Sequence, residues 1–224
     1  MGWPTSEPSY VLDRRGIDGT VVKAWQALRA VIASPATARA QAEAIRRSRQ
    51  RSASESARLV VRWLYLRREV AALARRTGIH VFDQGLLQAL WSVAYQAADP
   101  SALDALTDPL LSLPIRRPIA VLLLSDLATV RRRLTERQST ASRVEQDLER
   151  TAGEEPLTKA QHALAAVLEI AHRLELSATW EVLRFDTGDD KTPEQIVTEV
   201  TGALCRSIGA RAAPTDQAMS RHAL

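Results

Sequence analysis

The stretch IHVFDQGLLQALWSVAYQ, residues 79–96, joins a short apolar run to an acid and then to an amphipathic helix. Val81 and Phe82 predict a buried strand, Asp83 stands at its carboxyl end, and Gly85 allows a tight turn into the helix. Ligands of open α/β sheets bind outside the carboxyl ends of the strands. Asp83 is therefore a candidate to hold a metal ion or a substrate hydroxyl, with helix capping as the alternative role.

A second apolar run, IAVLLL at residues 119–124, predicts another buried strand. Asp126 follows it as the expected N-cap of a helix. A small polar loop then leads from that helix to Arg143 and Glu145 and reads as a lid. The helix is rich in arginine: Arg131, Arg132, Arg133 and Arg137.

The order of strand, acidic turn, arginine-bearing helix and polar lid is similar to a region of thymidylate kinase-like P-loop kinases. On this resemblance, Asp126 matches the family's acidic turn, and Arg133 and Arg137 match its two helix arginines. Arg143 and Glu145 match the end of its lid, which reads Ser-Arg-x-Glu. The resemblance extends over about residues 79–205.

The earlier strand matches the same family, with one departure. Asp83 takes the acid of the family's Asp-Arg pair, but Gln84 replaces the arginine with a neutral amide. Ser92, Ala94 and Tyr95 echo the serine, alanine and tyrosine that follow in the family. A second departure is larger: the chain contains no G-x-x-x-x-G-K-[ST] loop, the segment that cradles phosphates in these kinases.

The resemblance implies an α/β fold with a three-layer, P-loop kinase-like parallel sheet flanked by helices. Because the chain opens near the family's second strand, at residues 10–13, we expect it to lack the central first strand, as a start codon placed too late would cause. The incomplete domain is expected to cover residues 1–208, and the polar segment 209–224 is expected to be a disordered tail.

The activity that the resemblance implies is ATP-dependent phosphoryl transfer to a small acceptor, a nucleotide or nucleoside. Asp83 would orient Mg²⁺ or the acceptor, Arg133 and Arg137 would face the phosphates, and Arg143 would close from the lid. Mg²⁺ and ATP are the implied cofactors, and without the phosphate loop the chain as given is expected to be inactive. The alternative is a noncatalytic, pseudokinase-like binding or regulatory domain. The substrate-binding candidates are Arg47, Arg51, Gln84 and Tyr95.

Composition predicts a soluble chain and leaves the reason for its positive charge open. The net charge is +4, and 27 of the 30 basic residues are arginine, which suits phosphate recognition or reflects a GC-rich genome. The basic run at residues 46–56 has no interleaved aromatic residues, so nucleic acid is not favoured as a partner. The single Cys205 excludes an intramolecular disulfide and fits a cytoplasmic location. No apolar segment has the length of a membrane span, so no membrane partner is expected.

The remaining pattern is mainly helical, with a last strand at residues 180–185. Thr192, Pro193 and Gln195 predict a capping box with proline at the first helical position. The helix predicted over residues 54–76 carries an apolar stripe that packs either on the sheet or on a partner chain, and the resemblance permits a homodimer. The stripe comprises Leu59, Trp63, Leu66, Val70 and Leu73. Other helices are predicted at residues 21–32, 36–51, 156–176 and from 193 to about 208.

Overall fold

The computed structural model describes residues 17–75, 79–82, 85–99, 103–113, 115, 117–136, 143–150, 155–188 and 190–212. Helices make up most of these residues, and the sheet within them has two parallel strands, β1 (Ile119–Leu124) and β2 (Glu181–Asp186). The predicted three-layer parallel sheet is therefore wrong. Residues 10–13, where a further strand was expected, lie outside the described ranges.

The strand predicted at Val81 and Phe82 is also wrong, because this segment has irregular backbone. Val81 is 79% exposed, and Ile79 is exposed as well. A strand is stable only when a neighbouring strand satisfies its backbone groups. The described residues provide no such neighbour for this run.

The chain divides into two compact units, which are described separately. The helical unit lies within residues 1–118 and 139–181, and the strand unit within residues 119–138 and 182–224. The helical unit contains α1 (Ile17–Ala33), α2 (Pro35–Arg47), α3 (Ala53–Leu73), α4 (Leu86–Ala94), α5 (Asp104–Leu111), α7 (Arg143–Arg150) and α8 (Glu155–Leu176).

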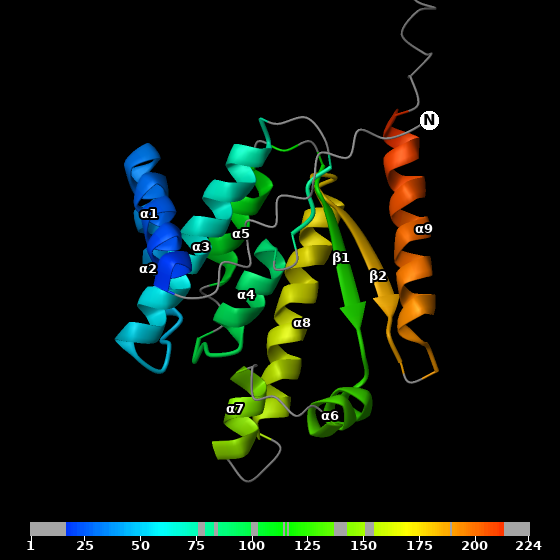
Figure 1. Ribbon diagram of the computed structural model, residues 1–224. Coiled ribbons are helices and arrows are strands. Elements are labelled where there is room, and N and C mark those ends of the chain that lie inside the picture. The colour runs from blue at the N-terminus through cyan, green and yellow to red at the C-terminus, as the bar shows by residue number, and fades with distance from the viewer. Residues whose placement is uncertain are drawn as a thin grey trace, which may run out of the picture. The chain divides into compact units, whose positions relative to one another are not determined.

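Helix α3 lies at the centre of one half of the helical unit, in contact with α1, α2 and α4 (Figure 1). It begins at Ser52, whose side-chain oxygen accepts a hydrogen bond from the Glu55 backbone N–H at 3.1 Å. Its predicted stripe is buried at Leu59, Trp63 and Leu66, and at Val70. The stripe thus forms core among helices of the same unit, rather than packing on a sheet.

Helix α8 organises the other half of the helical unit. It packs against α4, α5 and α7, and Figure 1 shows α4 alongside it. The indole N–H of Trp180, just after α8, donates to the Leu110 carbonyl in α5 at 3.2 Å. These contacts fix α4 and α8 as neighbours, and the pocket described below lies at their junction.

The strand unit contains β1, all of β2 but its first residue, α6 (Leu127–Glu136) and α9 (Pro193–Ala212). The arrows of β1 and β2 point the same way in Figure 1. The strand predicted at residues 119–124 is confirmed as β1, but it is not buried as predicted, because Val121 and Leu123 are exposed. The capping box of α9 is also confirmed: the Thr192 N–H donates to Gln195 Oε1 at 2.8 Å, and the Gln195 N–H donates to Thr192 Oγ1 at 3.3 Å. Within the described ranges, every helix is too short or too polar to cross a membrane.

Candidate functional site: a pocket between the α2–α3 loop, α4 and α8

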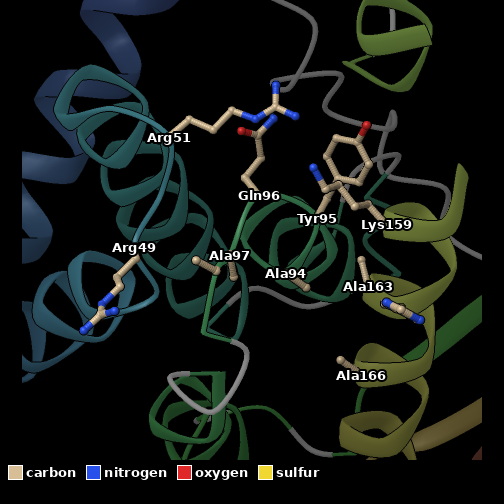
Figure 2. A pocket seen from close by; sticks show the side chains of 11 residues that line it. Arg49, Arg51, Ala94, Tyr95, Gln96, Ala97, Lys159, Ala163 and Ala166 are labelled. Carbon is tan, nitrogen blue, oxygen red and sulfur yellow. The ribbon is translucent and has the colours of Figure 1, made fainter. Parts of the chain in front are cut away.

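One pocket of the helical unit has a volume of about 360 Å³ and opens between three segments of the chain (Figure 2). The segments are the loop after α2, the carboxyl end of α4 with its following turn, and the first half of α8. The lining residues are Arg49, Arg51, Ala94, Tyr95, Gln96, Ala97, Ala98, Lys159, His162, Ala163 and Ala166.

Alanine side chains create the space in this pocket. Ala94 and Ala97 approach from the end of α4, and Ala163 and Ala166 approach from one face of α8. A larger side chain at any of these positions would fill part of the volume. The other lining side chains are mostly polar, so the pocket combines the apolar surface of these alanines with basic side chains.

The loop between α2 and α3 is fixed against the turn after α4. The carbonyl of the buried Ser48 accepts the backbone N–H groups of Ala98 at 2.9 Å and Asp99 at 3.3 Å. Gln50 Nε2 donates to the Val93 carbonyl at 3.1 Å. Arg49, between them, has a φ of 54°, a left-handed conformation that few residues other than glycine adopt. The loop is thus held in one shape, and Arg51 is placed by it.

A charged cluster of Arg51, Asp147 and Tyr95 borders the pocket. Arg51 donates two parallel hydrogen bonds to the Asp147 carboxylate, from Nη1 at 2.8 Å and from Nη2 at 3.0 Å. The Tyr95 hydroxyl donates to the same carboxylate at 2.9 Å. Asp147 is only 5% exposed, whereas the Arg51 side chain reaches solvent. Tyr95 is held in turn by stacking on Trp91, with ring centroids 5.1 Å apart.

The cluster keeps Asp147 ionised. Burial alone raises the pKa of this carboxyl, but the hydrogen bonds from Arg51 and Tyr95 and the nearby positive charges outweigh burial. The net pKa of Asp147 lies below its ordinary value. The pKa of Arg51 is raised, chiefly by the hydrogen bond to Asp147. The guanidinium is therefore a permanent positive charge with a fixed orientation at the pocket.

We expect the pH dependence of stability to report this cluster. Because the pKa of Asp147 is lower in the folded chain, its stabilising contribution is full above the unfolded value of about 3.9 and is lost as pH falls through the folded value. The difference in unfolding free energy between the wild type and Asp147→Asn should therefore shrink below about pH 4. Urea unfolding between about pH 2.5 and 6 measures this difference. A difference that stays constant through that range would contradict the assignment.

The other basic residues at the pocket are less constrained than Arg51. Lys159 forms an exposed ion pair with Glu155, one turn away on α8. The Arg49 side chain is directed away from the alanine floor (Figure 2). His162 is exposed on α8. None of the described lining residues carries a carboxylate, so the charged groups that face the pocket are basic.

The structure brings together two of the four predicted substrate-binding residues. Arg51 and Tyr95 line the same pocket and share Asp147. Arg47 lies on the exposed surface of α2, where it binds Glu43 at 3.0 Å, and it does not line this pocket. Gln84, the fourth, lies outside the described residues.

The residues predicted for catalysis are not gathered at this pocket by the described structure. Asp83 and Arg137 lie outside the described residues, as does the side chain of Arg143, whose backbone begins α7. Asp83 was also the candidate for indirect Mg²⁺ binding. Within the described ranges, no three His, Cys, Asp or Glu side chains group as metal ligands.

Arg133, the remaining catalytic candidate, belongs to the strand unit and binds backbone there. Its Nη2 donates to the Thr187 carbonyl at 2.6 Å, and its Nη1 donates to Ser125 Oγ at 3.3 Å. These bonds tie together the segments that follow β1 and β2. Asp126 caps α6 as predicted, since its carboxylate accepts the Thr129 N–H at 2.9 Å and the Thr129 hydroxyl at 2.6 Å. These bonds, led by that of the hydroxyl, lower the pKa of Asp126.

Sequence reasoning missed Asp147 and the contribution of α8. The lid was expected to end at Arg143 and Glu145, with no element predicted for Asp147, but residues 143–150 form α7. If this segment is taken as a helix, Asp147 lies on the same face as Val144, one turn earlier. Val144 is buried, so that face points toward the core. Lys159, His162, Ala163 and Ala166 likewise share one face of α8 at helical spacing.

Comparison with known proteins gives no relative from which a site could be transferred: no family model, no curated protein and no solved structure matches the chain.

Proposed function

We propose that this chain binds a small phosphate-bearing ligand in the pocket between the α2–α3 loop, α4 and α8. The observation that carries the proposal is the Arg51 guanidinium, held by the buried Asp147 at the edge of an alanine-floored cavity. A fixed guanidinium loses little conformational freedom when it binds a ligand. Pocket geometry and charge therefore both favour an anion.

The hydrogen-bonding capacity of Arg51 supports a phosphate. A guanidinium has five N–H donors, and Asp147 accepts two hydrogen bonds from Arg51. Donors therefore remain for a ligand oxygen, while the carboxylate holds the plane of the group. Lys159, which forms an exposed ion pair with Glu155, adds a second basic side chain from α8. Phosphate oxygens accept several such bonds at once, which makes them suitable partners for a paired arginine and lysine.

The size of the cavity favours a small molecule over a macromolecule. A volume of about 360 Å³ falls in the range of small-ligand pockets, roughly 300–1,000 Å³. Tyr95 lines the pocket but is only 2% exposed and stacks on Trp91, so it offers a ligand little aromatic surface. The size of the pocket and its basic side chains fit a nucleoside monophosphate, which is the ligand class that we propose.

ATP-dependent phosphoryl transfer stays a prediction of the sequence resemblance. Binding of a phosphate-bearing ligand is compatible with that reaction and equally with a noncatalytic binding domain. The pocket supports the binding step, which both functions share. The two differ in turnover, and the residues assigned to turnover, Asp83, Arg137 and the side chain of Arg143, lie outside the described residues.

Titration calorimetry with thymidine monophosphate and with inorganic pyrophosphate tests the proposal. We expect the nucleotide to bind with a Kd below about 1 mM, or about −4 kcal/mol, and pyrophosphate to bind more weakly. Lys159→Gln should weaken nucleotide binding about tenfold, the equivalent of one charge-assisted hydrogen bond. Added salt should weaken binding further because the contacts are ionic.

The matched control is Arg206→Gln, which removes one positive charge from α9 in the strand unit. It should leave the Kd unchanged within about twofold, because Arg206 does not line the pocket and its exposed charge is screened by salt. Equal weakening by Lys159→Gln and Arg206→Gln would mean that the nucleotide responds to net charge and not to this pocket.

A further inference from the structure

Helix α1 exposes a row of large apolar side chains along one side. Val21, Trp25, Leu28 and Ile32 are between 47% and 71% exposed. Their spacing of four, three and four residues places them on one continuous stripe. The opposite side of the helix, which includes the buried Ala27, faces inward where α1 packs on α3. The stripe is therefore not used in the core of the helical unit.

This stripe is comparable in area to the largest apolar patch on a typical monomer, which is often functional. With the neighbouring Val31, also exposed, it offers roughly 500 Å² of apolar area, near the upper end of the 300–600 Å² of the largest patch on a typical monomer. Large patches of this kind mark interaction sites. Two such faces pressed together bury roughly 1,000 Å², which is about the minimum for a specific interface.

We propose that the α1 stripe is the interface with a second copy of this chain, with the two α1 helices packed antiparallel about a twofold axis. Apolar residues that alternate spacings of four and three form the contact line between paired helices, so the complementary surface is another helix with the same spacing. A second copy of this chain provides such a helix. The axis passes between Trp25 and Leu28, so that Trp25 lies opposite Leu28 of the partner subunit and Val21 lies opposite Ile32 of the partner subunit.

The charges on α1 are compatible with this antiparallel arrangement. Lys23 lies on the side of the helix opposite the stripe, about 200° from Val21 at 100° per residue, so it does not enter the interface. Arg29 is the charged residue that flanks the described stripe. In the antiparallel pair it lies beside Val22 of the partner subunit, so the two arginines stay apart and no like charges meet.

Engineered disulfides test this arrangement directly. In a Cys205→Ser background, the double variant Val21→Cys with Ile32→Cys should form a covalent dimer under mild oxidation, because each new thiol meets its counterpart in the second copy. The two positions are eleven residues apart on one helix, roughly 16 Å, so they cannot pair within one chain. Val21→Cys alone is the matched control and should form far less dimer.

Sedimentation equilibrium on the full chain gives the second measurement. We expect a reversible dimer in the wild type, and at least about a hundredfold weaker association in Leu28→Glu, which buries an unpaired carboxylate in each half of the seam. Leu176→Glu, the same substitution at an exposed position near the end of α8, should leave association unchanged.

Far-UV circular dichroism confirms that the Leu28→Glu variant remains helical. A wild-type monomer at every concentration would overturn the proposal, and so would a dimer that survives Leu28→Glu. Equal cross-linking of the double and single cysteine variants would also overturn it, since it would show contact without the antiparallel register.

Discussion

Replacing Trp63 by alanine is expected to lower the free energy of unfolding by about 4 kcal/mol, the largest effect we predict. Trp63 lies in the middle of α3 and is 1% exposed, where α3 contacts α1, α2 and α4. Truncation of a buried tryptophan costs the transfer free energy of the side chain and leaves a cavity, together about 3–5 kcal/mol. Total stability is about 5–15 kcal/mol, so the loss is a large fraction of it.

Thermal unfolding followed by circular dichroism measures this loss, and we expect Tm to fall by roughly 10 °C for a chain of this size. Trp63→Phe is the graded control: it keeps an aromatic ring in the site and should lose less than half as much. A Tm for Trp63→Ala within about 2 °C of the wild type would show that α3 is not the centre of the core.

Arg51→Ala is expected to cost about 3 kcal/mol of stability, the second largest effect. The variant leaves the Asp147 carboxylate buried without its guanidinium, and breaking a buried ion pair costs about 3–5 kcal/mol. The lower end applies because the Arg51 side chain is partly exposed, so water already screens the pair. Tyr95→Phe removes one hydrogen bond from the same carboxylate and should cost only about 1–2 kcal/mol.

A double-mutant cycle, measured by urea unfolding, isolates the interaction between Arg51 and Asp147 from their other contacts. Once Asp147 has been replaced by alanine, Arg51→Ala should cost much less than in the wild type, because no buried charge remains to be stranded. Additive losses for Arg51→Ala and Asp147→Ala would contradict the ion pair as the reason for the stability of this region.

Local elements of the fold could be predicted from the sequence because they depend on neighbouring residues. The apolar run of β1, the capping box at Thr192 and Gln195, and the cap at Asp126 each involve side chains within a few positions of one another. The α3 stripe predicted a buried face for the same reason. It could not show whether a sheet, a helix or another chain would cover that face.

The sheet could not be predicted in this way. Val81 and Phe82 have the composition of a strand, but a strand forms only where a partner is present, and composition does not identify the partner. In the structure this run is irregular, and Val81 is exposed. β1 and β2, which do pair, have nearly 60 residues between them, a separation that no local pattern encodes.

The candidate site was predicted in part. Arg51 and Tyr95 were selected through a family resemblance, and the structure places both at one pocket. Asp147, which orients them, was missed because it lies 96 residues from Arg51 and no element was predicted around it. Arg47 looked equivalent to Arg51 in the sequence, but in the structure it binds a glutamate on its own helix.

The proposed pocket is tested most directly by filling it while leaving every charge in place. Ala166→Phe introduces a large side chain from the partly exposed face of α8 that lines the cavity. Ala165→Phe, at the next position, makes the same change on an exposed face outside the lining. Because surface charge is identical in both variants, electrostatic attraction alone cannot distinguish them.

The decisive measurement is titration calorimetry of thymidine monophosphate into the wild type, Ala166→Phe and Ala165→Phe. The account predicts that the wild type and Ala165→Phe bind with the same Kd, and that Ala166→Phe loses affinity by at least about tenfold, or about 1.4 kcal/mol. Binding that is unchanged in Ala166→Phe would contradict the assignment of the ligand to this pocket.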